Sequence, residues 1–462
     1  MTYSAASSAT PTKDSGSGRK AVLGAWIGLF VDMFDVYLPI IVLAPATAYF
    51  QPESLSEGTR SVITAMVFAA TLLGRPIGAL VFGHLSDRTG RKRTTVAAVV
   101  GFGATTLAIA ALPGYESLGL TAVALLILLR FVDGIFLGGQ YTSAIPSAFE
   151  QCPKAKRGLY GAFIMTGFPL AYCSIALITF VLLKVVPAGG PDAPYARWGW
   201  RIPFVIGGLL ALGFALWYLR SVRESEAWKA APKSRRSPLA ELFQGPNLKS
   251  FLQVFTLMSG IWLSFNMVGA VLPGLLKSRT GLSDVQVTTS MITSYALLAG
   301  AYLVAGVIGQ RYGRRPFLLA AGAAIATAVP AAYGVLVSGT ALGYAWTLAL
   351  VALVVVLTVS VFGVVTTYIN ERFHVGIRSS AYGLGYTTAV MIPSFYAFFQ
   401  AGLAVWLPMH QTPLILLAVG GVLVCVGAWL GPETREADLT GGARQAAPAP
   451  SPGVRPAALG EN

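Results

Sequence analysis

Residues 83–93 read GHLSDRTGRKR, and residues 306–315 read GVIGQRYGRR. The two stretches place glycine and arginine at matching positions, and Arg88 and Arg311 are 223 residues apart. Glycine permits a tight reversal of the chain, and arginine can bind carboxylates or the carbonyl groups at a helix end. A single basic loop is weak evidence of function, but its recurrence indicates that the chain is built from two similar halves.

A second motif repeats at nearly the same offset. Glu150 is followed seven residues later by Arg157, and Glu371 is followed seven residues later by Arg378. The two pairs are 221 residues apart and lie in equivalent loops. Two independent motifs that recur at almost one offset are hard to attribute to chance. Paired repeats are a device of secondary transporters, in which one half moves against the other.

The composition indicates an integral membrane protein. Of the 462 residues, 55% are hydrophobic and only 11% are charged, and the mean hydropathy is +0.66. These values exclude a soluble globular chain, a disordered chain, a collagen-like repeat and a disulfide scaffold. Cys152, Cys173 and Cys425 show no pairing or metal-ligand spacing, and the three histidines are far apart. We therefore expect no metal site and no cofactor.

The apolar segments predict an all-helical, polytopic fold with twelve transmembrane helices in two six-helix repeats. A segment of about 20 apolar residues crosses a membrane as a helix, because lipid offers its backbone no hydrogen-bond partners. The expected spans lie near residues 21–48, 61–82, 95–114, 118–142, 158–186, 200–220, 250–276, 288–308, 316–338, 344–369, 379–405 and 412–431. The first run is as long as a full span, so we expect no cleavable signal peptide.

The spans divide the chain into five parts. We expect an N-terminal tail at residues 1–20, a first half at 21–220, a basic linker at 221–249, a second half at 250–431 and a disordered tail at 432–462. The last part is rich in Ala, Pro and Gly, a composition that cannot bury a core.

The Lys and Arg residues are distributed very unequally between the two sides of the membrane. Twelve crossings put both termini on one side, and the loops and tails of that side carry 25 of the 33 Lys and Arg residues, against five for the other side. Basic residues mark cytoplasmic loops, so we expect both termini in the cytoplasm. The same distribution argues against nucleic acid as a partner, although the net charge is +14.

The sequence resembles the major facilitator superfamily from about residue 20 to residue 435. It is more narrowly similar to the metabolite–proton symporters and to their aromatic-acid, sialate and sugar neighbours through RPIG at 75–78, FGHLSDRTGRK at 82–92, the glycine pair at 138–139 after Arg130, and residues 150–158. It departs from those symporters at Asp133, where they commonly have Gln, and at Gln140, where they commonly have Glu. The resemblance implies a monomer in the bacterial inner membrane that works by alternating access.

A few ionisable side chains lie at membrane depth, where they are costly and usually face a water-filled path or a charged partner. Asp32 and Asp35 share a face of the first span. Arg130 and Asp133 share a face of the fourth, and Arg75 lies in the second. We predict proton coupling at Asp35, Asp32 or Asp133, because burial disfavours an ionised carboxylate. The resemblance favours Asp35. The alternative is that these acids form permanent structural pairs with the two arginines.

Candidate substrate-binding residues come from both halves: Arg130, Arg75, Gln140, Asn266, Tyr295, Tyr382 and Tyr386. A guanidinium can bind an anionic substrate because it stays charged. The second half has no mid-span acid or base before Glu371, so we expect it to supply hydrogen bonds and stacking. For any single tyrosine, helix packing or anchoring at the membrane interface is the alternative. As a group, the aromatic residues favour a substrate with a planar or carboxylated body.

By the resemblance, the repeated loops form a cytoplasmic gate whose ion pairs hold the outward-facing state and part when the protein turns inward. The candidate gate residues are Gly83, Asp87, Arg88, Gly90, Arg91, Glu150, Arg157, Arg311, Gly313, Arg314, Glu371 and Arg378. We expect Asp87 near the N-terminus of the eleventh span, where the helix dipole favours an anion. The alternative for each basic loop is that it only sets the topology.

These features predict a secondary transporter with protons and a small-molecule substrate as its partners in the lipid bilayer. Proton-coupled symport of a small organic acid or related metabolite is the first hypothesis, and proton-coupled antiport that exports a drug or metabolite is the alternative. A channel suits the duplicated gate less well. An intramembrane enzyme would need a nucleophile and base or a metal cluster, and the chain has no His-Glu-x-x-His motif. A non-transporting receptor stays open.

Overall fold

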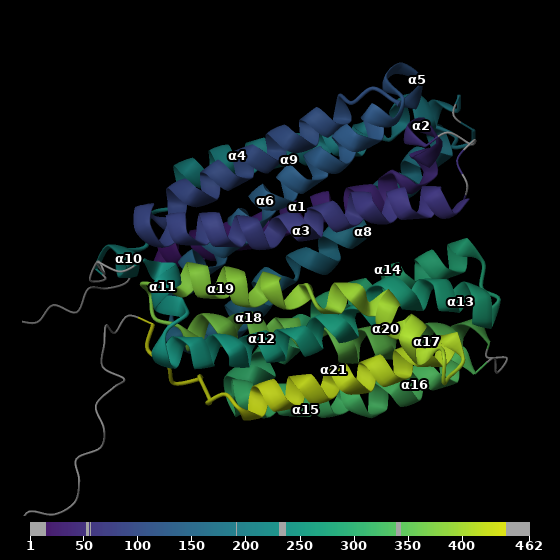
Figure 1. Cartoon of the computed structure of the whole chain (residues 1–462). Coiled ribbons are helices and arrows are strands. Elements are labelled where there is room, and N and C mark those ends of the chain that lie inside the picture. The colour runs from purple at the N-terminus through teal and green to yellow at the C-terminus, as the bar shows by residue number, and fades with distance from the viewer. Residues whose placement is uncertain are drawn as a thin grey trace, which may run out of the picture.

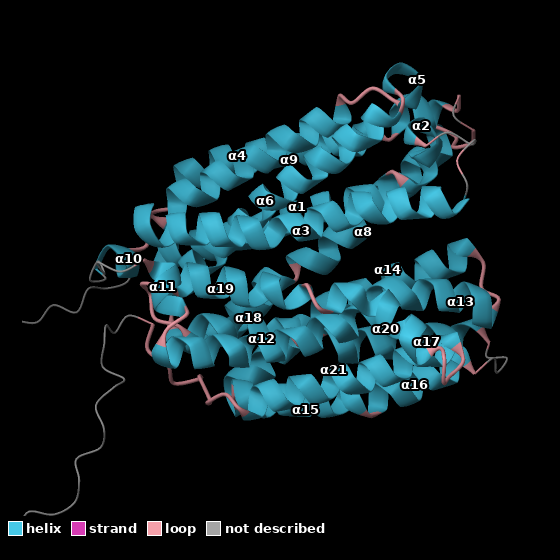
Figure 2. Ribbon diagram, viewed as in Figure 1, coloured by secondary structure: helices cyan, strands magenta, loops and turns pink. Residues whose placement is uncertain are grey.

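Helices form every regular element in the described part of this computed structural model, which comprises residues 15–51, 55, 57–190, 192–230, 237–338 and 343–439 (Figure 2). The expected N-terminal tail up to residue 14, the middle of the linker at 231–236 and the last part of the expected C-terminal tail, 440–462, lie outside the described residues.

The first half consists of six long helical segments joined by short turns. Its elements are α1 (Ser15–Tyr37), η1 (Leu38–Val42), η2 (Ala44–Ala46), α2 (Thr47–Phe50), α3 (Glu57–Thr89), α4 (Arg91–Ala110), α5 (Tyr115–Leu118), α6 (Leu120–Glu150), η3 (Lys154–Lys156), α7 (Arg157–Met165), α8 (Gly167–Val185), η4 (Tyr195–Gly199) and α9 (Arg201–Ser221). Two short helices, α10 (Glu226–Ala230) and α11 (Pro238–Leu242), follow in the linker.

The second half repeats this plan. Its elements are α12 (Gly245–Asn266), η5 (Met267–Val271), α13 (Leu272–Thr280), α14 (Asp284–Tyr312), α15 (Arg314–Ala326), α16 (Ala328–Val337), α17 (Tyr344–Val359), α18 (Phe362–Arg372), α19 (Arg378–Thr387), η6 (Thr388–Val390), η7 (Pro393–Phe395), α20 (Tyr396–Leu403), η8 (Met409–Gln411) and α21 (Thr412–Trp429).

The helices match the twelve predicted spans. Ten helical segments of the described residues are long and apolar enough to cross a membrane. The predicted span at 61–82 lies inside α3, which has 33 residues. The predicted span at 379–405 is divided into α19, η6, η7 and α20, because Pro393 has no N–H to donate and begins a new turn.

Glycines bring α3 and α6 into close contact and so fix the positions of the membrane-buried charges. A Cβ atom added at Gly74 or Gly78 of α3 would lie 2.3 Å or 1.9 Å from a backbone carbonyl oxygen of α6. In return, a Cβ atom added at Gly134 or Gly138 of α6 would lie 2.2 Å or 2.3 Å from a carbonyl oxygen of α3. The two backbones therefore touch directly, as small residues permit in membrane proteins.

The two halves lie side by side and meet most closely at one end of the bundle (Figure 1). There α19 packs against α3 and α6, and α14 packs against α7. This end, the left in Figure 1, carries α10, α11 and the basic loops at 88–93, 154–157, 311–315 and 372–378. We call it the basic face. At the other end, marked by α5 and α13, the halves diverge (Figure 1).

Candidate functional site

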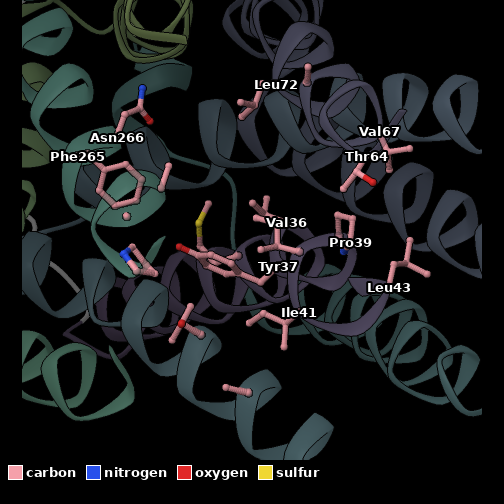
Figure 3. Close-up of a pocket in the computed structure, with 18 of the residues that line it drawn as sticks. Val36, Tyr37, Pro39, Ile41, Leu43, Thr64, Val67, Leu72, Phe265 and Asn266 are labelled. Carbon is pink, nitrogen blue, oxygen red and sulfur yellow. The ribbon is translucent and has the colours of Figure 1, made fainter. Parts of the chain in front are cut away.

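A cavity of about 1420 Å³ lies between the two halves. At the end away from the basic face it is lined by Thr47, Gln51 and Arg60, and it reaches inward to Arg75 of α3 and Tyr386 of α19. Figure 3 shows side chains of both halves around it, with Tyr37 from α1 near Phe265 and Asn266 from α12. The cavity therefore ends in the middle of the bundle, above the closely packed basic face.

The inner wall of the cavity is aromatic. Trp262 packs edge-on against Phe362 and Tyr386, with ring centroids 5.4 Å apart in both cases. Tyr172 of the first half stacks on Tyr295 of the second half, with ring centroids 4.3 Å apart. All five side chains line the cavity. Such a wall suits an apolar or planar body, because aromatic rings offer large apolar area with preferred stacking geometries.

The charged side chains among the described lining residues are Arg60 and Arg75, and no described acid lines the cavity. The guanidinium carbon of Arg75 lies 5.7 Å from the ring centroid of Tyr141. Asn266, which also lines the cavity, donates its amide to the carbonyl of Pro393 at 2.9 Å. The lining therefore presents positive charge at both ends of an otherwise mostly apolar space.

Asp32 lies directly behind Arg75. Nη2 of Arg75 and Oδ1 of Asp32 are 2.5 Å apart, and Asp32 is fully buried and does not line the cavity. The second carboxylate oxygen of Asp32 has no hydrogen-bond partner within the described part of the chain. Arg75 is thus the link between this buried acid and the cavity.

The other buried charges form a separate cluster. Nη1 of Arg130 contacts Asp35 at 2.9 Å and Asp133 at 3.0 Å, and Thr106 donates to the remaining oxygen of Asp35 at 2.7 Å. None of these four residues lines the cavity. With Asp32 and Arg75, the two clusters hold three carboxylates against two guanidiniums. If all were ionised, one negative charge would lack a counterion, which is costly at this depth.

The structure divides the predicted substrate-binding residues into two groups. Arg75, Asn266, Tyr295 and Tyr386 line the cavity. The others, Arg130, Gln140 and Tyr382, do not.

These three predicted residues are held inside the protein. Arg130 is occupied by Asp35 and Asp133. Gln140 is fully buried and faces α1, because a Cβ atom added at Gly28 would lie 2.0 Å from its amide nitrogen. Tyr382 lies behind Tyr386, with ring centroids 5.7 Å apart.

Sequence reasoning missed several lining residues: Tyr37, Phe168, Tyr172, Trp262, Phe265 and Phe362. Their spacing along the helices is that of any packed apolar face, so the sequence holds no signal that sets them apart. Thr106 was also missed, and a lone hydroxyl in the third span is equally uninformative.

The basic face is closed by a buried ion network that joins the halves. One oxygen of Glu150 accepts from Arg91 at 3.0 Å and from Arg378 of the second half at 2.9 Å. Arg91 also pairs with Asp87 and donates to the carbonyl of Val375 at 2.8 Å. These four charged groups are buried.

Asp87 lies at the N-terminus of α19. It accepts hydrogen bonds from the backbone N–H groups of Ser379, at 3.2 Å, and Ser380, at 2.9 Å, and from the hydroxyl of Ser380 at 2.7 Å. A Cβ atom added at Gly83 would lie 3.0 Å from the Cα atom of Ser380, so this glycine permits the close approach of α3 to α19. The free N–H groups and the dipole of a helix N-terminus favour an anion at this position.

The second half has a related but different network. Arg314 forms two bonds to Glu371, at 3.1 Å and 3.0 Å, and donates to the side chain of Gln310 at 2.8 Å. Gln310 in turn accepts from the N–H of Gly158 near the start of α7, at 2.9 Å. Gln310 thus occupies the place that Asp87 has in the first half, but without its charge.

Three further gate candidates remain: Arg157 was expected in an ion pair, whereas Arg88 and Arg311 were named only as part of the repeated loops. Arg157 donates to the main-chain carbonyl of Ala437 at 2.7 Å. Arg88 and Arg311 are exposed, and Arg311 lies over the ring of Tyr312. The two remaining glycines form the turns between helices, because Gly90 and Gly313 have φ values of 115° and 108°, which side chains rarely adopt.

Two glutamates that sequence reasoning missed cap the helices that follow these turns. Glu224 accepts from the N–H groups of Arg91 and Lys92. Glu433 accepts from the N–H groups of Arg314 and Arg315 in the same way. The available signal was their equivalent place, shortly after the sixth and the twelfth span.

The first residues of the expected C-terminal tail, 432–439, pack against the basic face. Thr434 donates to Glu371 at 2.8 Å, and Leu439 is buried and accepts from Arg378 at 3.3 Å. Glu436 pairs with Lys154 of the first half at 2.8 Å, and the hydrogen bond from Lys154 lowers the pKa of this exposed carboxyl group. This part of the expected tail is therefore held to both halves.

The sequence profile of the Major Facilitator Superfamily matches residues 25–398. The chain is 30% identical to the inner membrane metabolite transport protein YhjE of Escherichia coli K12, covering 65% of this chain and 68% of that protein. It is 29% identical to the alpha-ketoglutarate permease of the same strain, covering 80% and 83%. The proton:xylose symporter XylE, from E. coli, has a similar structure, with a TM-score of 0.72 at 20% identity over 92% of this chain and 98% of that chain. These likenesses and the observed helices confirm the predicted twelve-helix fold.

Proposed function

This chain belongs to the Major Facilitator Superfamily and is a membrane transporter rather than an enzyme, and from that premise we propose that it takes up a small organic acid together with protons by alternating access. The observation that carries the proposal is the central cavity, in which Arg75 faces the substrate space on one side and the buried Asp32 on the other. An arginine provides an anion site, and a buried acid beside it provides a proton site.

The halves at 21–220 and 250–431 are the moving bodies of this proposal. With the basic face in the cytoplasm of a bacterium, as its Lys and Arg content favours, the cavity belongs to an outward-facing state. The network of Asp87, Arg91, Glu150 and Arg378 then closes the cytoplasmic side. Rocking of the halves would break it and expose the cavity to the cytoplasm.

The relatives support the substrate class. One is named as a permease for alpha-ketoglutarate, an organic acid, and another as a metabolite transport protein of the inner membrane. A cavity whose charged lining residues are arginines also suits an anion better than a cation. The rival is antiport, in which protons enter as a drug or metabolite leaves.

Uptake into proteoliposomes with an imposed pH gradient tests the proposal. Purified protein is reconstituted and offered a panel of carboxylates, aromatic acids and sugars, with protein-free liposomes as the control. Symport predicts that an interior more alkaline than the medium drives accumulation of a carboxylate and that an ionophore abolishes it. If only an acidic interior drives uptake, antiport replaces symport, and if sugars alone accumulate, the substrate class is wrong.

A further inference from the structure

Arg75 can bind either Asp32 or the carboxylate of a substrate in the cavity, but its position allows only one of them at a time. Its Nη2 atom binds Asp32, whereas Nε has no hydrogen-bond partner in the described residues and the side chain lines the cavity. Carboxylates and guanidiniums prefer a two-bond fork geometry, and Asp32 is bound through one oxygen only. A substrate carboxylate that enters the cavity can therefore compete with Asp32 for this guanidinium.

Asp32 and Asp35 differ in the hydrogen-bond partners that they would keep if a substrate bound to Arg75. Asp35 is bound by both Arg130 and Thr106, and neither of them lines the cavity. Asp32 has Arg75 as its single hydrogen-bonding partner in the described residues. If Arg75 turned to a substrate, Asp32 would stay fully buried without a counterion, a state that a proton relieves.

Among the residues that the structure describes, no second cation faces Asp32 to replace Arg75. The titratable and charged groups that face it are Asp35 on α1, Arg75 on α3, Tyr141 and Asp133 on α6, and Tyr382 and Tyr386 on α19. Two of these are acids, which disfavour a lone Asp32 anion further. Arg130 is held by the other two carboxylates.

We propose that the substrate carboxylate displaces Asp32 from Arg75 and that Asp32 then takes the cotransported proton. This inference rests on the proposed function. The ion pair between Arg75 and Asp32 is broken, an ion pair between Arg75 and the substrate forms, and a proton from cavity water binds to the carboxylate of Asp32. The site is neutral before and after, so one proton accompanies each monocarboxylate and the transported charge is zero. Asp32, and not Asp35, is the coupling acid.

Binding of benzoate at different pH values tests the exchange. Benzoate is used because it is a planar monocarboxylate that stays ionised above pH 6 and fits the aromatic wall of Trp262, Phe362 and Tyr386. Uptake of one proton per bound benzoate requires that the Kd rise about tenfold for each pH unit between pH 6 and 8. A weakly buffered solution with a pH indicator should report about one proton taken up per site.

Variants identify the acid. In Asp32→Asn the competitor of benzoate is gone, so the Kd should be independent of pH and, at pH 8, lower than that of the wild type. A purely structural role of Asp32 predicts weaker binding instead. In Arg75→Gln binding should be lost, and Arg75→Lys should restore part of it because a cation is kept. Proton uptake that persists in Asp32→Asn but vanishes in Asp35→Asn would overturn the proposal.

Failure of this inference can be told from failure of the proposed function. If benzoate or another carboxylate of the panel binds with a Kd that does not depend on pH in the wild type, the exchange is wrong although a carboxylate site exists. If no carboxylate of the panel binds, the proposed substrate class fails and the exchange with it. In proteoliposomes, monocarboxylate uptake should not respond to a potassium–valinomycin potential at equal pH. Uptake driven by a negative interior would show more than one proton per monocarboxylate, and uptake driven by a positive interior would show none; either result would overturn the one-for-one exchange.

Discussion

Arg378 in the second half donates to Glu150 in the first half, with 2.9 Å between Nη1 and Oε1. The same oxygen of Glu150 also accepts from Arg91 of its own half, at 3.0 Å. All three side chains are buried, so opening of the basic face must separate a desolvated charge pair. The buried pair therefore stabilises the closed state, and breaking it costs free energy, as a gate with two discrete states requires.

Substitution Arg378→Gln should favour opening of the basic face. It removes the cross-half cation from Glu150, and breaking a buried pair typically costs 3–5 kcal/mol, reduced here to about 1–3 kcal/mol because Arg91 stays bound. Spin labels at positions 88 and 311, one exposed site in each half, should report a longer mean distance. Arg93→Gln, at an exposed arginine of the same basic face, is the matched control, and equal distances in both variants would contradict the gate assignment.

Changes at Asp87 should affect turnover more than substrate binding. Asp87→Asn keeps one acceptor oxygen for the N–H groups of α19 but removes the charge that pairs with Arg91 and interacts favourably with the helix dipole, the dipole part alone being about 0.5–1 kcal/mol. Asp87→Lys places a cation against a helix N-terminus and should slow substrate counterflow at least tenfold. The Kd for substrate should change little in either variant. Wild-type counterflow in Asp87→Lys would remove this residue from the gate.

Much of this architecture can be predicted from the sequence because its signals are local. Each apolar run is long enough to cross a membrane whatever its neighbours are, and the motif around Arg88 and Arg311 recurs at a fixed offset. The spacing of Glu150 and Arg157 also identified the loops that meet at the basic face. It did not tell that Arg157 would bind the carbonyl of Ala437 rather than a carboxylate.

The sequence could not predict which of the buried acids pairs with which arginine. Asp32 and Asp35 are three residues apart, and which of them meets Arg75 depends on the rotation and depth of α1, α3 and α6. Backbone contact at glycines such as Gly78 sets that depth, and a sequence pattern gives no measure of it. The aromatic cavity wall was hidden for a different reason, since Trp262 looks like any other packed aromatic residue.

Substitution Gly78→Ala should destabilise the protein. The added Cβ atom would lie 1.9 Å from the carbonyl oxygen of Ile135, so α3 and α6 must move apart, at about 1–3 kcal/mol as for other overpacked sites. Because Gly78 lies three residues after Arg75, affinity for substrate should fall as well. Gly213→Ala is the control, since a Cβ atom there meets nothing within 4 Å. Thermal unfolding in detergent should show a lower midpoint for Gly78→Ala alone.

Truncation within the C-terminal segment should loosen the basic face. Within the described part of this segment, Glu433 caps α15, Thr434 donates to Glu371, and the carbonyls of Ala437 and Leu439 accept from one arginine of each half. Deletion of 433–462 leaves those arginines with fewer acceptors, and each unmatched buried group costs about 1–3 kcal/mol. Deletion of 440–462 keeps all of these contacts and serves as the control. The longer deletion should lower the unfolding midpoint and lengthen the distance between labels at 88 and 311, whereas the shorter one should match the full chain. If the two deletions behave alike, the segment does not hold the halves together.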